Sequence, residues 1–204
     1  MKFIQVWHFC PAVLILAFSA TQSIAGGDEK AGRIKFETCA GCHSKPGYSN
    51  AYPRYNVPKL AGQHAAYTVS ALKAYSNNER SHPSMQGNAA GLSPQDFEDI
   101  AAYLASFELA NNETEVSGDI GAGEEKAASC AGCHGEGGNS LDGNYPKLSA
   151  QYESYLVKVL QDYRSQKRTN PMMNAMVGAL SDEDIDNIAA FYASQTKGIG
   201  VAER

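Results

Sequence analysis

The chain has 204 residues, with 17 lysine and arginine side chains against 22 aspartate and glutamate side chains, and a formal net charge of -5. This acidic balance argues against nucleic-acid binding, which selects for basic patches that contact phosphate. It favours protein partners that present a basic docking face, or contacts that depend little on charge.

Residues 1–25 have the pattern of a secretory signal peptide. Lys2 gives a positive start, an apolar stretch covers residues 12–18, and small residues precede a predicted cleavage point after Ala25. The apolar stretch is far shorter than the ~20 residues that span a bilayer. No later stretch is apolar enough to do so, and we expect a soluble protein in the periplasm. Cleavage removes Cys10 and leaves four cysteines.

A first helix is expected over residues 29–39, and it leads into Cys39-Ala40-Gly41-Cys42-His43. The pattern C-x-x-C-H is the attachment signature of a c-type haem. Two thiols one helical turn apart can each add to a vinyl group of the same porphyrin. The histidine that follows is then placed under the iron as its proximal ligand.

The rest of the first unit also has a helical pattern. A glycine- and proline-rich loop (residues 44–58) precedes a helix expected over residues 65–75, and a second irregular stretch carries Met85. The last helix is expected to begin at Ser93-Pro94-Gln95-Asp96, which provides a cap, a proline at the first helical position and a carboxylate three residues after the cap. Residues 111–121 are polar and glycine-rich, and are typical of a linker.

The second half of the chain repeats the first. The two C-x-x-C-H motifs are offset by 91 residues, whereas the later matches, such as Pro58-Lys59-Leu60 with Pro146-Lys147-Leu148, are offset by 88. The loop after the first motif is therefore three residues longer. Neither half shows an alternating strand pattern, so the sequence predicts an all-α fold in which each domain wraps around a covalently bound haem. The predicted divisions are a signal peptide (1–25), domain 1 (26–110), a linker (111–121) and domain 2 (122–204).

A zinc site or a redox-active dithiol fits the cysteine pairs poorly. A zinc ribbon places ~15–20 residues between its two pairs, but 87 residues separate Cys42 from Cys130. A thioredoxin-like dithiol would follow a strand in a βαβ pattern, which is absent. The sequence therefore predicts two haem c groups, each with an iron, bound through the four remaining cysteines: Cys39, Cys42, Cys130 and Cys133.

Methionine is the predicted sixth iron ligand, because His/Met ligation raises the reduction potential and suits electron transfer. Met85 is the single methionine of the first unit, whereas the second unit has Met172, Met173 and Met176. The repeat register matches Met173 with Met85, and the other two are then interpreted as core filler. The predicted iron ligands are His43, Met85, His134 and Met173.

Two histidines remain, and neither is duplicated. In the repeat register His64 falls opposite Tyr152, and His82 falls opposite Asn170. His82 lies near Met85 in sequence and is the alternative ligand if the first haem is held by two histidines. Otherwise both side chains are expected to be exposed or locally hydrogen-bonded.

Several residues are candidates for supporting the haems. The carbonyl of Pro58 or Pro146 could hold the second ring nitrogen of the proximal histidine, or these prolines could be simple turn residues; both interpretations stay open. Gln63, Tyr67, Arg80 and their repeat partners are candidates for hydrogen bonds to haem carboxylates. The tyrosines could equally be ordinary core residues.

The sequence resembles the dihaem cytochrome c4 family over essentially all of the predicted mature chain. The resemblance rests on the two C-A-G-C-H motifs and on the segments 57–67, 145–151 and 180–185. It implies two class I cytochrome c domains related by a pseudo-twofold axis, with their haem propionate edges facing each other. It also implies the His43/Met85 and His134/Met173 ligand pairs. Val57, where the second unit has Tyr145, departs from the family pattern.

The predicted function is periplasmic electron transfer. The resemblance implies transfer from a respiratory donor towards an acceptor such as a terminal oxidase, sometimes with loose association to the membrane. The alternative is a cytochrome subunit of a dehydrogenase complex, such as a sulfide-oxidising flavocytochrome. A dihaem peroxidase or thiosulfate dehydrogenase is a third hypothesis, but such sites need an exchangeable iron position or a ligand other than methionine. No catalytic constellation recurs in the sequence.

Overall fold

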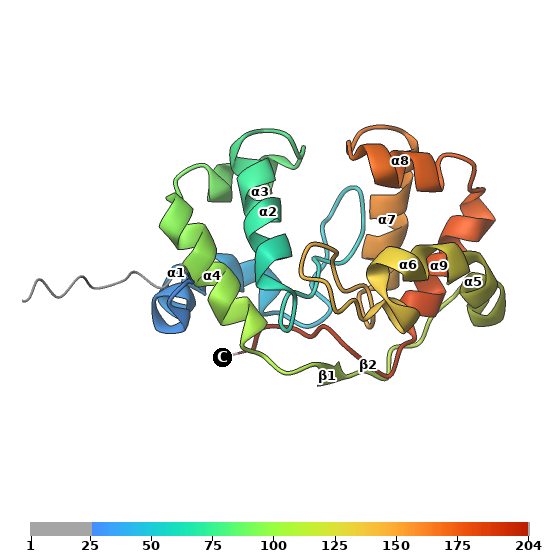
Figure 1. The fold of residues 1–204 in the computed structure, drawn as a ribbon, viewed down its shortest axis with the longest axis horizontal. Coiled ribbons are helices and arrows are strands. Elements are labelled where there is room, and N and C mark those ends of the chain that lie inside the picture. The colour runs from blue at the N-terminus through green and yellow to red at the C-terminus, as the bar shows by residue number, and fades with distance from the viewer. Residues whose placement is uncertain (1–25, 204) are drawn as a thin grey trace, which may run out of the picture.

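Two similar helical units lie side by side in the computed structural model, which describes residues 26–203 (Figure 1). The segment predicted as a signal peptide lies outside the described residues. The first unit contains α1 (Glu29–His43), α2 (Ala65–Ser76), α3 (Pro83–Ala89) and α4 (Pro94–Ala105). The second contains α5 (Ile120–Ala127), η1 (Ala128–Cys130), α6 (Ala131–His134), η2 (Glu136–Gly138), α7 (Glu153–Arg164), α8 (Pro171–Val177) and α9 (Asp182–Ala193). In residues 26–203, no helix is both long and apolar enough to cross a membrane.

The helix starts follow the cap residues in the sequence. Ser93 and Ser181 each form a capping box with the aspartate three residues later, Asp96 and Asp184. The two irregular stretches expected before these helices instead contain the short helices α3 and α8. Each begins with a proline at the first helical position, directly after a side chain that caps the helix. The expectation of irregular structure was therefore wrong, because the capping signal there was not recognised.

The first and last helices of each unit cross at a glycine. A Cβ atom added to Gly32 would lie 1.9 Å from the carbonyl oxygen of Asp99, and one added to Gly123 would lie 2.0 Å from that of Asn187. The absence of a side chain thus allows α1 to approach the backbone of α4, and α5 to approach α9. An ion pair joins the same helices in each unit, Lys35 with Asp96 in the first and Lys126 with Asp184 in the second.

Each unit has its own apolar core. In the first, Phe36 of α1 packs against Ile100 and Leu104 of α4; in the second, Leu156 of α7 packs against Ile188 and Tyr192 of α9. The end of the chain then leaves the second unit. It pairs as β2 (Lys197–Gly198) with β1 (Ala110–Asn111), and Gly200 forms a bridge to Ala61.

The C-terminus therefore finishes beneath the first unit (Figure 1). Ala202 is fully buried in the core of the first unit, although residues 122–204 were predicted as the second domain. The hydroxyl of Ser44 also donates to the carbonyl oxygen of Ala202, close to the first haem motif. The last residues thus act as a strap from one unit to the other.

Candidate haem sites

Each C-x-x-C-H motif lies at the end of a helical segment. Cys39, Cys42 and His43 occupy the last turns of α1, with Cys39 half-buried and Cys42 exposed. In the second unit the helix is interrupted: α5 ends at Ala127, and a short 3-10 turn carries the chain into α6, which ends at His134. Within residues 26–203 no disulfide joins these four cysteines, which leaves both pairs for thioether bonds to a porphyrin.

The two motif histidines are buried and oriented by proline carbonyls. Nδ1 of His43 lies 3.0 Å from the carbonyl oxygen of Pro58, and Nδ1 of His134 lies 2.9 Å from that of Pro146. A carbonyl only accepts, so Nδ1 must carry the hydrogen and Nε2 keeps a lone pair for a metal. Burial lowers the pKa of both imidazoles, which favours the neutral ring that iron requires. Of the two interpretations of these prolines, the structure selects the carbonyl acceptor.

The two matched methionines occupy the same place in equivalent helices. Met85 is the third residue of α3, and its N–H donates to Nδ1 of His82 at 3.3 Å. Met173 is the third residue of α8, and its N–H donates to Oδ1 of Asn170 at 3.0 Å. Met85 packs half-buried against the first core.

The other methionines of the second unit are placed differently. Met173 is half-buried, whereas Met172 and Met176 are 63% and 41% exposed. Their exposure does not fit the interpretation of these two residues as core filler. Met173 is the least exposed methionine of α8.

Both spare histidines have structural roles. Nε2 of His64 lies 2.8 Å from the carbonyl oxygen of Ser140, in the haem loop of the other unit. His82 caps α3 through Nδ1, and its Nε2 lies 3.0 Å from the hydroxyl of Tyr55. Because both ring nitrogens of His82 are engaged, this arrangement favours Met85 as the axial ligand.

Two arginines lie where the units meet. Arg80 stacks on Tyr75 of its own unit and donates to the hydroxyl of Tyr155 in the other, at 2.9 Å. In the second unit, Arg168 likewise stacks on Tyr163 and donates to the hydroxyl of Tyr67 in the first unit, at 3.3 Å.

These arginines make the centre of the interface positive. No carboxylate in residues 26–203 forms an ion pair with Arg80 or Arg168. Although burial opposes the change, their two charges lower the pKa of Tyr67 to about 8. A positive site with partly buried arginines suits the carboxylates of a haem, so Arg80 and Arg168 fit this predicted role.

The glutamines, in contrast, bind the opposite unit. Gln63 accepts from the backbone N–H of Lys147 at 2.9 Å and donates to its carbonyl oxygen at 3.0 Å. Gln151 makes the same two bonds with Lys59, at 2.9 Å and 3.0 Å. The prediction that these side chains contact haem carboxylates is replaced by a reciprocal pair of contacts between the units.

The repeat register aligns Gln63 with Gln151 and Lys59 with Lys147. It does not show that each glutamine bonds the lysine of the opposite unit. The sequence shows only that these residues recur in both halves, and it gives no reason for their recurrence.

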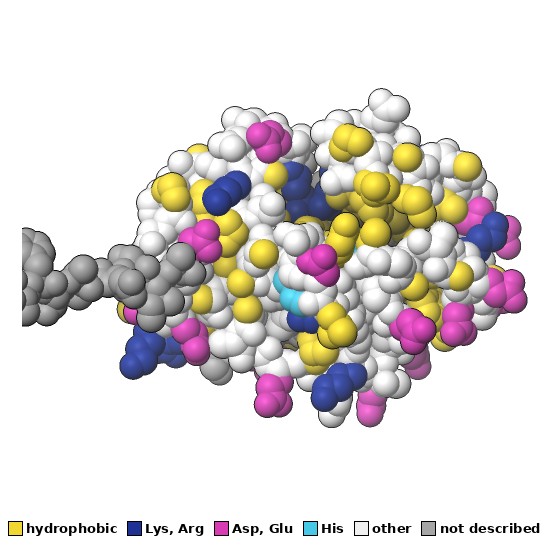
Figure 2. Space-filling view, viewed as in Figure 1, with side chains coloured by type: hydrophobic (Ala, Val, Ile, Leu, Met, Phe, Trp, Pro, Cys, Tyr) yellow, Lys and Arg dark blue, Asp and Glu magenta, His cyan; other side chains and the backbone are white. Residues whose placement is uncertain are grey.

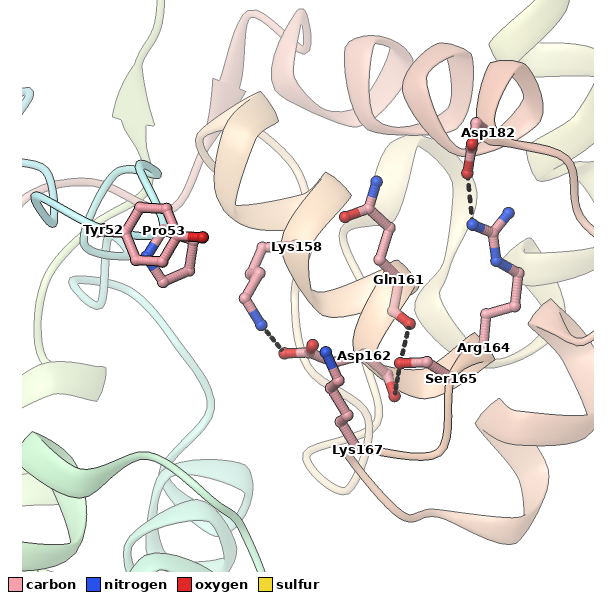
Figure 3. A pocket seen from close by; sticks show the side chains of 9 residues that line it. All are labelled: Tyr52, Pro53, Lys158, Gln161, Asp162, Arg164, Ser165, Lys167 and Asp182. Atoms are coloured by element: carbon pink, nitrogen blue, oxygen red, sulfur yellow. Dashed lines mark hydrogen bonds and ion pairs between the residues drawn. The ribbon is translucent and has the colours of Figure 1, made fainter.

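One open groove between the units is not a haem site. It has a volume of about 710 Å³ and lies between Tyr52-Pro53 of the first haem loop and α7 (Figure 3). Two ion pairs lie along its second-unit side, Lys158 with Asp162 and Arg164 with Asp182. None of the motif cysteines or histidines, nor Met85 or Met173, lines it. On the face shown in Figure 2, apolar side chains gather over the second unit, with acidic side chains towards its outer edge.

Taken together, the paired thiols, the oriented histidines and the matched methionines fit two c-type haems. When bound, each haem supplies a one-electron couple between ferric and ferrous iron. The family model for cytochrome c matches twice, over residues 29–108 and 121–196. The fold and the sites thus define a mostly helical cytochrome with two tandem cytochrome c domains and two haem c groups.

Similarity to characterised proteins makes the assignment more specific. The chain is 46% identical to cytochrome c4 of Pseudomonas aeruginosa over 180 residues, which covers 82% of this chain and 88% of that protein. The solved structure of cytochrome c4 from Pseudomonas stutzeri superposes with a TM-score of 0.65 at 28% identity, covering 83% of this chain and all of that one. Cytochrome c4 of Acidithiobacillus ferrooxidans gives 0.67 at 27% identity, covering 78% and 99%. The chain belongs to the cytochrome c4 family and is an electron carrier rather than an enzyme.

Proposed function

We propose that eight residues hold the two haems. Cys39 and Cys42 form the thioether bonds of the first haem, with His43 and Met85 as its axial ligands. The corresponding residues of the second haem are Cys130, Cys133, His134 and Met173. The observation that carries this assignment is its repetition: in both units the histidine bonds a proline carbonyl, and the methionine is the third residue of a capped helix.

We further propose that the protein carries electrons in the periplasm, from a respiratory donor to an acceptor such as a terminal oxidase. The predicted signal peptide and the use of all the remaining cysteines in haem motifs support this location. The reciprocal contacts between the units support a path in which an electron enters at one haem and leaves at the other. With two axial ligands on each iron, no position is left for a substrate.

More distant relatives indicate a second candidate for the electron donor. The chain is 29% identical to a protein of Stutzerimonas stutzeri described as a thiosulfate dehydrogenase electron acceptor, over 76% of this chain and 78% of that one. A thiosulfate dehydrogenase structure from Marichromatium purpuratum superposes with a TM-score of 0.71 at 28% identity, and this chain covers 40% of it. A dehydrogenase is therefore the alternative electron donor.

A potentiometric titration followed by optical and magnetic spectra tests the haem assignment. We expect two one-electron steps and low-spin, six-coordinate iron at both sites in neutral solution. High-spin iron in the intact protein, or rapid turnover of peroxide, would instead support an enzyme with an open iron position.

Stopped-flow mixing distinguishes the partners. We expect the reduced protein to be reoxidised rapidly by a purified terminal oxidase. Rapid reduction by thiosulfate dehydrogenase and thiosulfate, with slow reoxidation by the oxidase, would favour the dehydrogenase alternative.

A further inference from the structure

The two units differ in the length of the loop that follows the haem motif, and in the first unit this loop brings Tyr55 to His82, the cap of the helix that carries Met85. Tyr55 is buried, and its hydroxyl lies 3.0 Å from Nε2 of His82. Tyr55 lies in the part of the first loop where the two halves differ in length, and His82 falls opposite Asn170 in the repeat register. The second unit, with asparagine at this cap, therefore lacks the pair.

Hydrogen bonds connect Tyr55 to the backbone of Met85 through one imidazole. Nδ1 of His82 accepts from the N–H of Met85 at 3.3 Å, so this nitrogen carries no hydrogen. Nε2 must then carry the hydrogen and donate to the hydroxyl oxygen of Tyr55. The side chain that caps α3 is thus held at its far end by the loop.

The second unit holds that loop in place. The ring of Tyr55 packs against Tyr155 of α7 with 6.5 Å between centroids, and Nζ of Lys158 lies 5.8 Å from the centre of the Tyr55 ring. The backbone N–H of Gly47 donates to the hydroxyl of Tyr152 at 2.8 Å. The position of Tyr55, and through it that of His82, therefore depends on α7 of the opposite unit.

The methionine helix of the second unit is held from within its own unit. Nδ2 of Asn174 on α8 donates to the carbonyl oxygens of Tyr163 and Arg168, at 2.5 Å and 3.0 Å. The equivalent residue in the first unit is Gln86, whose side-chain amide donates instead to the exposed side chain of Asn78, at 2.7 Å. In α3 the connection from His82 to Tyr55 adds a support that α8 lacks.

We propose that Tyr55 and His82 are positioning residues, through which the second unit holds Met85 against the iron of the first haem. The proposal rests on Met85 being an axial ligand. The cap of α3 is the hydrogen bond from the N–H of Met85 to Nδ1 of His82. It fixes the first turn of the helix, which carries the Met85 side chain. Loosening the cap weakens the sulfur–iron bond, and loss of the soft thioether lowers the potential of that haem.

Replacement of Tyr55 by phenylalanine in the full dihaem protein tests the proposal. The rate at which imidazole displaces methionine from ferric iron is measured for each haem by following the two methionine methyl resonances. We expect displacement to become ~2–10-fold faster at the first haem, the effect of one neutral hydrogen bond, with a lower potential there. The second haem should keep its rate and its potential. Tyr52→Phe is the matched control, since Tyr52 lies on the same loop and is 95% exposed.

The substitution His82→Asn separates the two roles of the histidine. It installs the cap that the second unit uses at Asn170, but it removes the connection to Tyr55. We expect it to accelerate displacement as much as Tyr55→Phe, and the double variant to add nothing further. Wild-type behaviour of His82→Asn, additive effects in the double variant, or equal changes at both haems would overturn the proposal.

The methyl resonances are assigned with the variants Met85→Ala and Met173→Ala. If Met85→Ala removes neither resonance, the ligand assignment fails, and this proposal fails with it. If Met85→Ala removes one resonance but Tyr55→Phe leaves the displacement rate unchanged, the positioning role alone is wrong.

Discussion

At the scale of single residues, the motif histidine of each haem site has one ring nitrogen already hydrogen-bonded within the protein. His43 and His134 direct one ring nitrogen to a proline carbonyl, and this fixes the ring and leaves the other nitrogen for iron. Both ring nitrogens of His82 are engaged, Nδ1 as the cap of α3 and Nε2 with the hydroxyl of Tyr55. Hydrogen-bond partners, more than residue type, therefore distinguish the roles of these histidines.

Met173 gives a prediction at the residue scale. Met173→Ala should abolish the sulfur–iron charge-transfer band of one haem and one of the two methionine methyl resonances, because alanine offers no sixth ligand. Optical spectra in the near-infrared and proton spectra provide the measurement. Met172→Ala and Met176→Ala are the controls, since both methionines are exposed on the same helix. Loss of the band in either control would contradict the repeat register.

At the scale of helices, each unit is built on one close crossing. Gly32 and Gly123 allow the helix before the haem motif to contact the backbone of the last helix, and a lysine–aspartate pair joins the same two helices. The sequence predicted these crossing helices and the caps of α4 and α9. It did not reveal why the glycines recur, since their function appears only when the helices cross.

Replacing the crossing glycine tests this packing. Gly123→Ala should destabilise the holoprotein by about 2–3 kcal/mol, since the new methyl group would overlap the carbonyl oxygen of Asn187. Urea unfolding followed by helical circular dichroism measures the change. Gly121→Ala on the same helix is the control, because its nearest neighbour is Oδ1 of Asp119 at 3.4 Å and alanine is the better helix former. Equal destabilisation by both variants would argue against the crossing.

The pH dependence of stability provides another prediction for these helices. Hydrogen bonds from Lys35 and Ser93 lower the pKa of Asp96 to about 2, below its ordinary value of 3.8. The folded state therefore favours the carboxylate, so its stabilising contribution is complete above about pH 4 and is lost as the pH falls towards about 2.

Thermal unfolding of wild type and Asp96→Asn over this range measures the effect. We expect the variant to have the lower Tm in neutral solution, and the difference to disappear in the acid range. The pKa of Asp184 is also about 2, so Asp184→Asn should behave alike. A Tm difference that stays constant down to about pH 2 would show that the charge of Asp96 is not responsible.

At the scale of the whole molecule, the contacts between the two units are reciprocal: a residue of one unit bonds a residue of the other, and the equivalent residues form the same bond in the opposite direction. Gln63 binds Lys147 while Gln151 binds Lys59, and the two arginines exchange tyrosines in the same way. The exceptions are the longer first loop and the C-terminal strap, which have no counterpart. These exceptions make two similar haem sites unequal.

Shortening the chain tests the strap. Removal of residues 200–204 deletes the backbone bonds between Gly200 and residues 60–61 and takes Ala202 out of the first core. We expect the first unit to lose about 2–4 kcal/mol of stability, from a few hydrogen bonds and a small buried side chain. The loss should appear as earlier bleaching of one haem during denaturant titration. Removing only residues 203–204 is the control, and equal loss in both proteins would contradict a role for the strap.

The sequence by itself determined the haem chemistry and the duplication. The spacing of cysteines and histidine reflects covalent geometry within one helical turn, and the repeat register needs no coordinates. Only the tertiary structure decided that Gln63 crosses to Lys147, that the C-terminus returns to the first core, and that Tyr55 lies against His82. These contacts join residues 27 to more than 80 positions apart. They depend on how the two units and their loops are placed in space, and no local pattern encodes that placement.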